Sequence, residues 1–114
     1  MANQVNIKNK DRCRFYNMQP QYGDLETARE SRIIRYELIE KLSDKQLEDR
    51  GIYRGAMGMY EVSTERAEDA TPMTLSDESL EVWKRYINKL SARGLVYYLD
   101  ESFFREILSM QPEE

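Results

Sequence analysis

The sequence contains no histidine and only one cysteine. Without histidine there is no imidazole for acid–base catalysis, metal ligation or a switch near neutral pH. A single cysteine excludes an internal disulfide and any multi-cysteine metal site. The five glycines do not form a phosphate-cradling loop or a dinucleotide fingerprint, and no calcium-loop pattern is present. We therefore expect neither a cofactor nor a metal ion.

The one cysteine, Cys13, is the only soft nucleophile in the chain. Its neighbours Arg12 and Arg14 could lower the pKa of the thiol. Because no histidine is available as a base, a catalytic Cys13 would need an unusual partner. A buried, incidental cysteine is the better interpretation, and we expect a protein that is not an enzyme.

Long hydrophobic runs are also missing. No segment approaches the roughly 20 apolar residues that cross a bilayer, so we expect no membrane partner. Residues 1–10 lack the apolar core of a secretion signal. Together with the unpaired cysteine, this favours a reducing compartment and a cytoplasmic protein.

What the sequence does contain fits one domain with a core. It has 114 residues, of which 40% are hydrophobic and 33% charged, and it includes eight tyrosines and one tryptophan. The charge is uneven: residues 1–54 hold 11 basic and 9 acidic side chains, whereas residues 55–114 hold 6 and 12. Such asymmetry indicates either a surface that attracts a charged partner or two mixed, solvated faces.

The pattern of apolar residues predicts an N-terminal arm over residues 1–23 and a single helical domain over residues 24–112. In the arm, Val5 and Ile7 alternate with polar residues, as in a short edge strand. Asp24 is placed to cap a helix that ends near Leu42. One arc of that helix carries Leu25, Ala28, Tyr36, Leu38, Ile39 and Leu42, with Ile33 and Ile34 outside it. Central burial is favoured, and a homodimer is expected if the face of residues 33–42 is not core.

Further helices are indicated by capping signals. Ser43 and Gln46 form a capping-box pattern, and Gly51 stands where a helix stop needs a left-handed residue. Residues 63–72 read as an exposed connector. A third helix begins after Ser76 and ends at Gly94, with Trp83 on its apolar stripe. Residues 95–99 fit either a strand or a link, and Asp100 is placed to cap a last helix containing Phe103 and Phe104.

The fold expected from these signals is mainly α. It is a small domain of three to four helices, to which residues 57–62 and 95–99 could add a minor two-stranded β element.

Residues 38–54 resemble a short motif of the YjiS-like family of arginine-rich bacterial proteins. The matching residues are Leu42, Ser43, Asp44, Leu47, Asp49, Gly51, Ile52 and Arg54. The resemblance implies a small regulatory protein, in a family where some members have a suggested RNA association and none an assigned catalytic site. Helix capping by Ser43 and helix termination at Gly51 would also explain these motif residues without an evolutionary relationship to that family.

We therefore expect a non-enzymatic regulatory or adaptor protein that acts through protein–protein contacts. Methionine repacks easily and tyrosine is enriched at interfaces, which makes the glycine-containing segment 53–60 a candidate contact surface. The predicted contact residues are Arg32, Arg35, Tyr53, Arg54, Met57, Met59 and Tyr60. Two alternatives stay open: an RNA-associated regulator of the YjiS-like type, and a virus-encoded (phage) inhibitor that covers a host protein or nucleoprotein surface.

Overall fold

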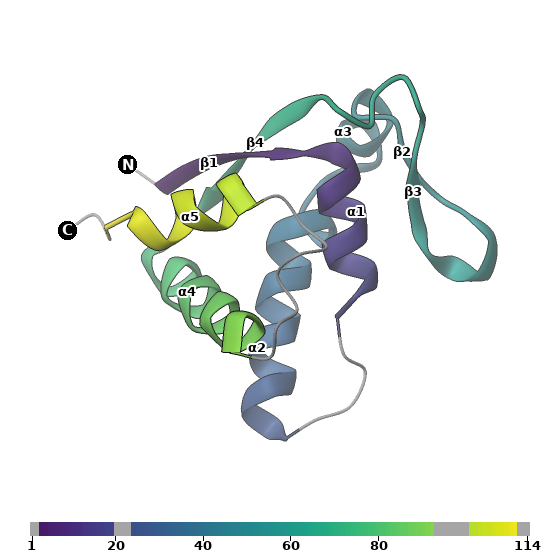
Figure 1. The fold of residues 1–114 in the computed structure, drawn as a ribbon. Coiled ribbons are helices and arrows are strands. Elements are labelled where there is room, and N and C mark those ends of the chain that lie inside the picture. Colours follow the sequence, from purple (N-terminus) through teal and green to yellow (C-terminus); the bar gives the residue numbers. More distant parts are fainter. Residues whose placement is uncertain (1–2, 20–23, 93–100, 112–114) are drawn as a thin grey trace.

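A computed structural model describes residues 3–19, 24–92 and 101–111 (Figure 1). The elements that it contains are, in chain order, β1 (Asn3–Lys8), α1 (Asn9–Asn17), α2 (Leu25–Arg35), a π-helical turn (Tyr36–Glu40), α3 (Asp44–Asp49), β2 (Ile52–Arg54), a 3₁₀ turn (Ala56–Gly58), β3 (Tyr60–Val62), β4 (Ala70–Leu75), α4 (Asp77–Ala92) and α5 (Glu101–Ser109).

This architecture is a mixed α/β fold, so the prediction of a mainly α domain is wrong. Five α-helices and two antiparallel two-stranded sheets, β1–β4 and β2–β3, occur in the described ranges. Within residues 57–62, the strand β3 pairs with β2 in the register Ile52↔Val62. Residues 95–99, Gly94 and Asp100 lie outside the described residues.

The segment expected to be an N-terminal arm is instead built into the core. Val5 and Ile7 of β1 are 1% exposed and lie on the same face of the sheet as Met73 and Leu75 of β4. Beneath this face lie α5, α4 and α2, as Figure 1 shows. The alternation in β1 was visible in the sequence, but its partner strand was hidden, because Pro72 made residues 63–72 read as a connector.

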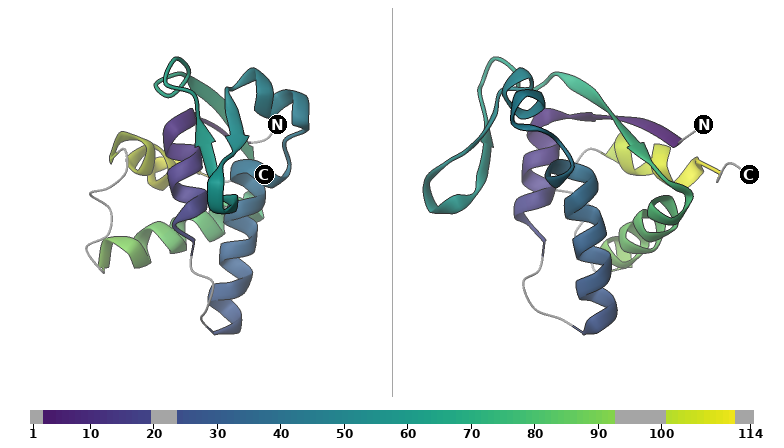
Figure 2. Two further views of the ribbon diagram at one scale, coloured as in Figure 1. Left: turned by 90° about the vertical axis from the view of Figure 1, so that its right-hand side faces the viewer. Right: turned by 180° about the vertical axis from the view of Figure 1, so that it is seen from behind.

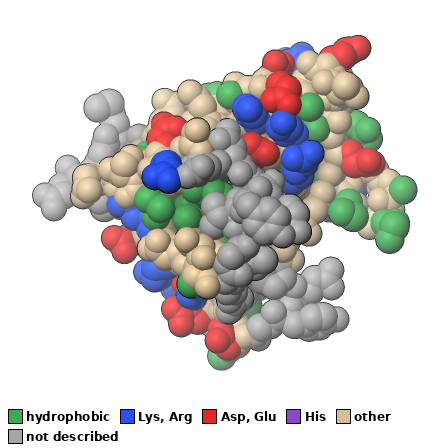
Figure 3. Space-filling view, viewed as in Figure 1, with side chains coloured by type: hydrophobic (Ala, Val, Ile, Leu, Met, Phe, Trp, Pro, Cys, Tyr) green, Lys and Arg blue, Asp and Glu red, His purple; other side chains and the backbone are tan. Residues whose placement is uncertain are grey.

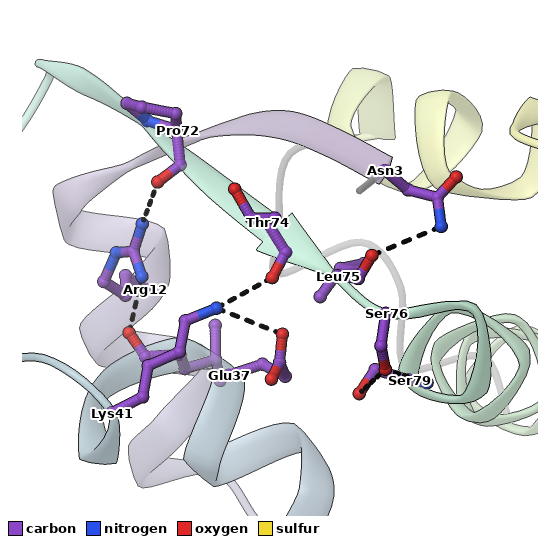
Figure 4. A network of polar contacts seen from close by, with 10 residues as sticks. Asn3, Arg12, Glu37, Lys41, Pro72, Thr74, Leu75, Ser76 and Ser79 are labelled. Carbon is purple, nitrogen blue, oxygen red and sulfur yellow. Dashed lines mark hydrogen bonds and ion pairs between the residues drawn. The ribbon is translucent and has the colours of Figure 1, made fainter. Parts of the chain in front are cut away.

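Side chains from other elements cap the outer edge of β4 (Figure 4). The guanidinium of Arg12 donates to the carbonyl of Pro72 at 3.4 Å, and Lys41 Nζ donates to the carbonyl of Thr74 at 2.8 Å. The nitrogen and carbonyl of one strand residue face the same side, so the nitrogen of Pro72, which has no hydrogen, also faces this edge. Proline and cations together occupy an edge that could otherwise pair with another strand.

A π-helical turn interrupts the long helix expected over residues 24–42. Lys41 N donates to Tyr36 O at 3.1 Å and Leu42 N to Ile39 O at 2.9 Å. The carbonyl of Leu38 accepts a hydrogen bond from Arg12 at 2.6 Å instead. The turn therefore places a carbonyl where the buried Arg12 can bind it, which ties α1 to the end of α2.

The predicted apolar arc of this helix is therefore only partly correct. Leu25 is 90% exposed and Tyr36 is 53% exposed, whereas Ile34, which the arc left out, is fully buried with Leu38 and Ile39. Ile34, Leu38 and Ile39 thus belong to the core, which removes the argument for a homodimer through the face of residues 33–42. On the buried face, Glu30 replaces an apolar residue and accepts from Arg85 Nε at 3.1 Å and Lys89 Nζ at 2.7 Å, both on α4.

Aromatic side chains fill the centre of the core. Phe15 lies 5.2 Å from Trp83 and 5.7 Å from Phe104, measured between ring centroids, and Trp83 also meets Phe103 edge-on at 5.9 Å. Each aromatic pair adds to the burial term. Trp83, which the sequence places on the apolar stripe of its helix, is fully buried at this centre.

Three predicted caps are present. Asp24 accepts from Thr27 N at 2.8 Å, Ser43 and Gln46 form the reciprocal capping box, and Ser76 accepts from Ser79 N at 3.1 Å. Gly51 has φ +71°, and a Cβ there would lie 2.5 Å from Ser63 Oγ, so only glycine fits. Local signals of this kind depend on a few adjacent residues, which is why the sequence reveals them.

None of the helices within 3–19, 24–92 and 101–111 combines the length and the apolar character needed to cross a membrane.

Candidate functional site

The β2–β3 hairpin, residues 52–62, projects from the body of the molecule on the side away from the start of β1 and the end of α5 (Figures 1 and 2). Its β3 strand is firmly held at Tyr60, which pairs with Arg54 next to the tip. The side-chain amide of Asn17 donates to Tyr60 O at 2.8 Å and accepts from Tyr60 N at 3.1 Å, as a paired strand would. Ile52 is buried, and the ring of Tyr16 meets that of Tyr60 at 5.1 Å. The hairpin is therefore a fixed projection of the core.

The tip of the hairpin presents a strained methionine to solvent. Met57 is 94% exposed and has φ +65°, and Gly58 after it has φ +75°. Two consecutive residues with positive φ are normally Asn-Gly, Asp-Gly or Gly-Gly, because a side chain such as that of methionine costs roughly 1 kcal/mol there. Hydrophobic side chains gather at this tip in the space-filling view (Figure 3). Neither folding nor solubility accounts for an apolar residue in this place.

A groove lies between α3 and the hairpin, and we call it the α3 groove. Its volume is about 420 Å³. The lining residues are Asp44, Leu47, Glu48, Ile52, Tyr53, Arg54 and Tyr60. The guanidinium of Arg54 lies over the ring of Tyr60, 4.7 Å from its centroid. The groove combines aromatic rings, an apolar floor and charges of both signs, which suits a polypeptide better than a small apolar molecule.

A second depression, which we call the methionine hollow, lies between α1 and Met59 of the hairpin. Its volume is about 340 Å³, and it is lined by Arg14, Asn17, Met18 and Met59. Met18 is 43% and Met59 is 49% exposed. With Met57 they place three accessible methionines at one end of the molecule, a composition typical of adaptable contact surfaces.

The structure brings five of the seven predicted contact residues together. Tyr53, Arg54, Met57, Met59 and Tyr60 all belong to the hairpin. Arg32 and Arg35 lie on α2, and Arg32 is exposed there. Arg35 is half-buried. It lies close enough to Tyr16 for its positive charge to lower the pKa of that hydroxyl, against the larger rise caused by burial. The ring of Tyr16 in turn contacts the ring of Tyr60 in the hairpin.

Two ionisable groups near the hairpin, the Tyr16 hydroxyl and the Cys13 thiol, have raised pKa values and stay neutral at pH 7. Burial and a hydrogen bond to Glu40 raise the pKa of Tyr16 to about 12. Burial raises the pKa of Cys13 to about 11, and the opposing charge of Arg12 does not reverse this. Cys13 is 4% exposed. Arg12 thus acts in the expected direction, but the pKa of the thiol rises overall because desolvation outweighs the nearby charge.

Several lining residues were not singled out from the sequence. Arg14, Asn17 and Met18 reach the hairpin from α1, and Asp44 and Glu48 reach it from α3. Asp44 and Leu47 were part of the quoted motif, but neither was predicted to line a site. Their place in a site depends on how α1 and α3 pack against the hairpin, and no local signal records that.

Across the described part of the chain, no three acidic or cysteine side chains come close enough to hold a metal ion. Comparison of the chain with protein-family models, curated proteins and solved structures found no match. Any functional assignment therefore depends on the hairpin and the surfaces beside it.

Proposed function

We propose that this protein is a non-enzymatic regulatory or adaptor protein that binds another protein through the β2–β3 hairpin. The observation that carries the proposal is Met57, an apolar side chain that is 94% exposed in a backbone conformation which disfavours it. A residue that breaks a local folding rule without a gain in packing is a strong candidate for a binding role.

The surroundings of Met57 support a protein partner. Tyr53 and Met59 are half-exposed on the same hairpin, and tyrosine and methionine are both enriched at protein interfaces. Because Asn17 fixes Tyr60 next to the tip, little conformational entropy is lost when the tip is bound. A preorganised apolar tip flanked by two depressions is well suited to insert into a partner's surface.

Substitutions at Met57 test the proposal. The protein is immobilised through a terminal tag, and partners are captured from cells that make it naturally. We expect Met57→Asn and Met57→Ala to lose a partner protein that the original sequence retains. The matched control is Leu25→Asn, because Leu25 is 90% exposed on α2, away from the hairpin.

Equal capture by all three variants and the original sequence would contradict a role for the hairpin. Treatment of the lysate with ribonuclease separates the RNA-associated alternative. If ribonuclease treatment abolishes the capture of every partner protein, binding is mediated by RNA and the proposal fails.

A further inference from the structure

The two depressions beside the hairpin differ in charge, because two carboxylates and one guanidinium line the α3 groove whereas only Arg14 is charged in the methionine hollow. Asp44 and Glu48 line the α3 groove, and their carboxylates make no hydrogen bond or ion pair with any other described residue. Both residues are exposed. Unlike Glu30, which is bonded by Arg85 and Lys89, these carboxylates form no ion pair with a cation of the described residues.

The groove already shows that its aromatic wall accommodates a guanidinium. Arg54 lies over the ring of Tyr60 at 4.7 Å, although the carboxylates of Asp44 and Glu48 line the same groove. The ring of Tyr53, the other tyrosine of the lining, is half-exposed. Cations are attracted to the face of a tyrosine ring, and guanidinium also pairs in a planar geometry with carboxylates.

We infer that the α3 groove receives an arginine or lysine side chain from an extended segment of the protein partner. A volume of about 420 Å³ holds one long side chain together with the main chain beside it. Asp44 and Glu48 pair with the incoming charge, Tyr53 stacks on its planar group, and Leu47 contacts its aliphatic stem. Arginine fits best, since it supplies both stacking and bidentate pairing.

This inference depends on the proposed function, since it names the chemistry of the segment that binds beside the hairpin. The two claims fail separately. Met57 tests whether the hairpin binds a protein at all, whereas Asp44 and Glu48 test only which side chain enters the groove.

The test is an NMR titration of the isotope-labelled protein with a short peptide. The probe is acetyl-Gly-Leu-Arg-Leu-Gly-amide, and the matched probe replaces arginine with citrulline, which keeps the shape and removes the charge. We expect the arginine peptide to shift the amide signals of Leu47, Ile52 and Tyr53. The citrulline peptide is expected to bind about tenfold more weakly.

Variants identify the carboxylates responsible. Asp44→Asn with Glu48→Gln is expected to reduce affinity for the arginine peptide about tenfold. Asp49→Asn with Glu65→Gln removes the same charge from exposed positions that do not line the groove, and is expected to retain binding. If the unaltered protein binds the arginine and citrulline peptides with equal affinity, the inference is overturned. This comparison does not depend on whether the variants fold.

Two further outcomes count against it. Shifts that map away from the groove, or shifts that persist in Asp44→Asn with Glu48→Gln, overturn the assignment of the site. If an oligouridine RNA perturbs the groove signals while the arginine peptide does not, the groove binds a different class of partner. If Met57→Asn loses its partner protein while the peptides do not bind the groove, the proposed function stands without this inference.

Discussion

At the scale of single residues, Met57 carries a conformational cost that the fold does not recover. Its left-handed backbone is one that asparagine and glycine adopt at little cost. We expect Met57→Asn to raise the free energy of unfolding by about 0.5–1 kcal/mol and Met57→Ala to leave it nearly unchanged. Urea denaturation followed by Trp83 fluorescence measures both. A clear loss of stability in Met57→Asn would mean that the side chain of Met57 supports the fold.

Arg12 is the opposite case, a charged residue that holds the core together. Its guanidinium is fully buried and binds the carbonyls of Leu38 and Pro72 and the hydroxyl of Thr71. Burial, followed by the nearby charge of Arg50, lowers its pKa to about 10, so it remains charged at neutral pH.

We expect Arg12→Met to cost at least about 2 kcal/mol, because buried acceptors lose their donor. The control is Arg14→Met on the exposed side of the same helix, for which a change below about 0.5 kcal/mol is expected. Thermal unfolding of both variants provides the comparison. Equal stability of the two would show that Arg12 does not fasten α1 to the π-helical turn.

A feature of a single residue could be predicted from the sequence when its hydrogen-bond partners are neighbours in the chain, and could not when they are distant. The caps at Asp24, Ser43 and Ser76 were predictable, because the donor and acceptor lie within a few positions of each other. The burial of Arg12 was not, since its acceptors lie 26 and 60 positions away in the chain. Met57 was predicted as a contact residue from composition, but its left-handed backbone had no signal in the sequence.

At the scale of elements, the attachment of α2 to α4 depends on Glu30. Burial alone would raise the pKa of this carboxyl, but hydrogen bonds from Lys89 and Arg85 outweigh it and hold the pKa below the ordinary value of 4.5. A carboxyl whose folded pKa is depressed stabilises the protein above its unfolded pKa. That stability is lost as the pH falls through the lower, folded value.

We expect Glu30→Gln to destabilise the protein by about 2 kcal/mol at pH 7, through the loss of charge-assisted hydrogen bonds. The difference from the original sequence should shrink as the pH falls below 4.5, which urea unfolding at pH 7 and pH 3 would measure. The exposed pair Arg29–Glu78 joins the same helices, so Glu78→Gln is the control, with less than about 0.5 kcal/mol expected. An unchanged difference at both pH values would contradict the ion-pair account.

The hairpin depends on Asn17 in a similar way. Two hydrogen bonds join its side chain to the main chain of Tyr60, and their loss should let β3 open locally. We expect Asn17→Ala to speed hydrogen exchange at the Tyr60 amide roughly tenfold. Asn6→Ala, on the exposed face of β1, should leave that rate unchanged. Exchange at Tyr60 that is equally slow in both variants would show that strand pairing alone holds the hairpin.

Among the elements, the helices were the easier part to predict. α4 has apolar residues at regular helical spacing, and its start was marked by Ser76. The β4 strand contains Pro72 and ends a polar stretch, so its pairing with β1 could be recognised only through contacts far apart in sequence. Leu25 and Tyr36 are exposed because α2 turns Glu30, Ser31 and Ile34 toward the core. Packing against α4, rather than the local sequence, selects that face.

At the scale of the whole molecule, the first strand, β1, is part of the hydrophobic core and contributes to the stability of the fold. Val5 and Ile7 face the core, whereas Gln4 and Asn6 of the same strand face solvent. We expect Val5→Ala with Ile7→Ala to cost about 4 kcal/mol or more. Gln4→Ala with Asn6→Ala should cost less than about 1 kcal/mol. Calorimetry of both double variants tests this, and similar melting temperatures would place β1 outside the cooperative core.

The site as a whole could be predicted only in part. Tyrosine and methionine content pointed to the hairpin, and five of the seven predicted contact residues lie on it. The two depressions beside the hairpin could not be predicted, because α1, α3 and the hairpin meet there only after the chain has folded. Arg32 was also predicted as a contact residue, but it lies on the exposed part of α2 and not on the hairpin.

The central claim is that Met57 touches a partner protein, and site-specific photo-crosslinking tests it most directly. A benzophenone amino acid is placed at position 57 or, as the control, at the similarly exposed position 25, in cells that make the protein naturally. We predict a discrete protein adduct at position 57 that resists ribonuclease and is absent at position 25. Adducts of equal yield at both positions, or an adduct at position 57 that ribonuclease removes, would contradict the claim.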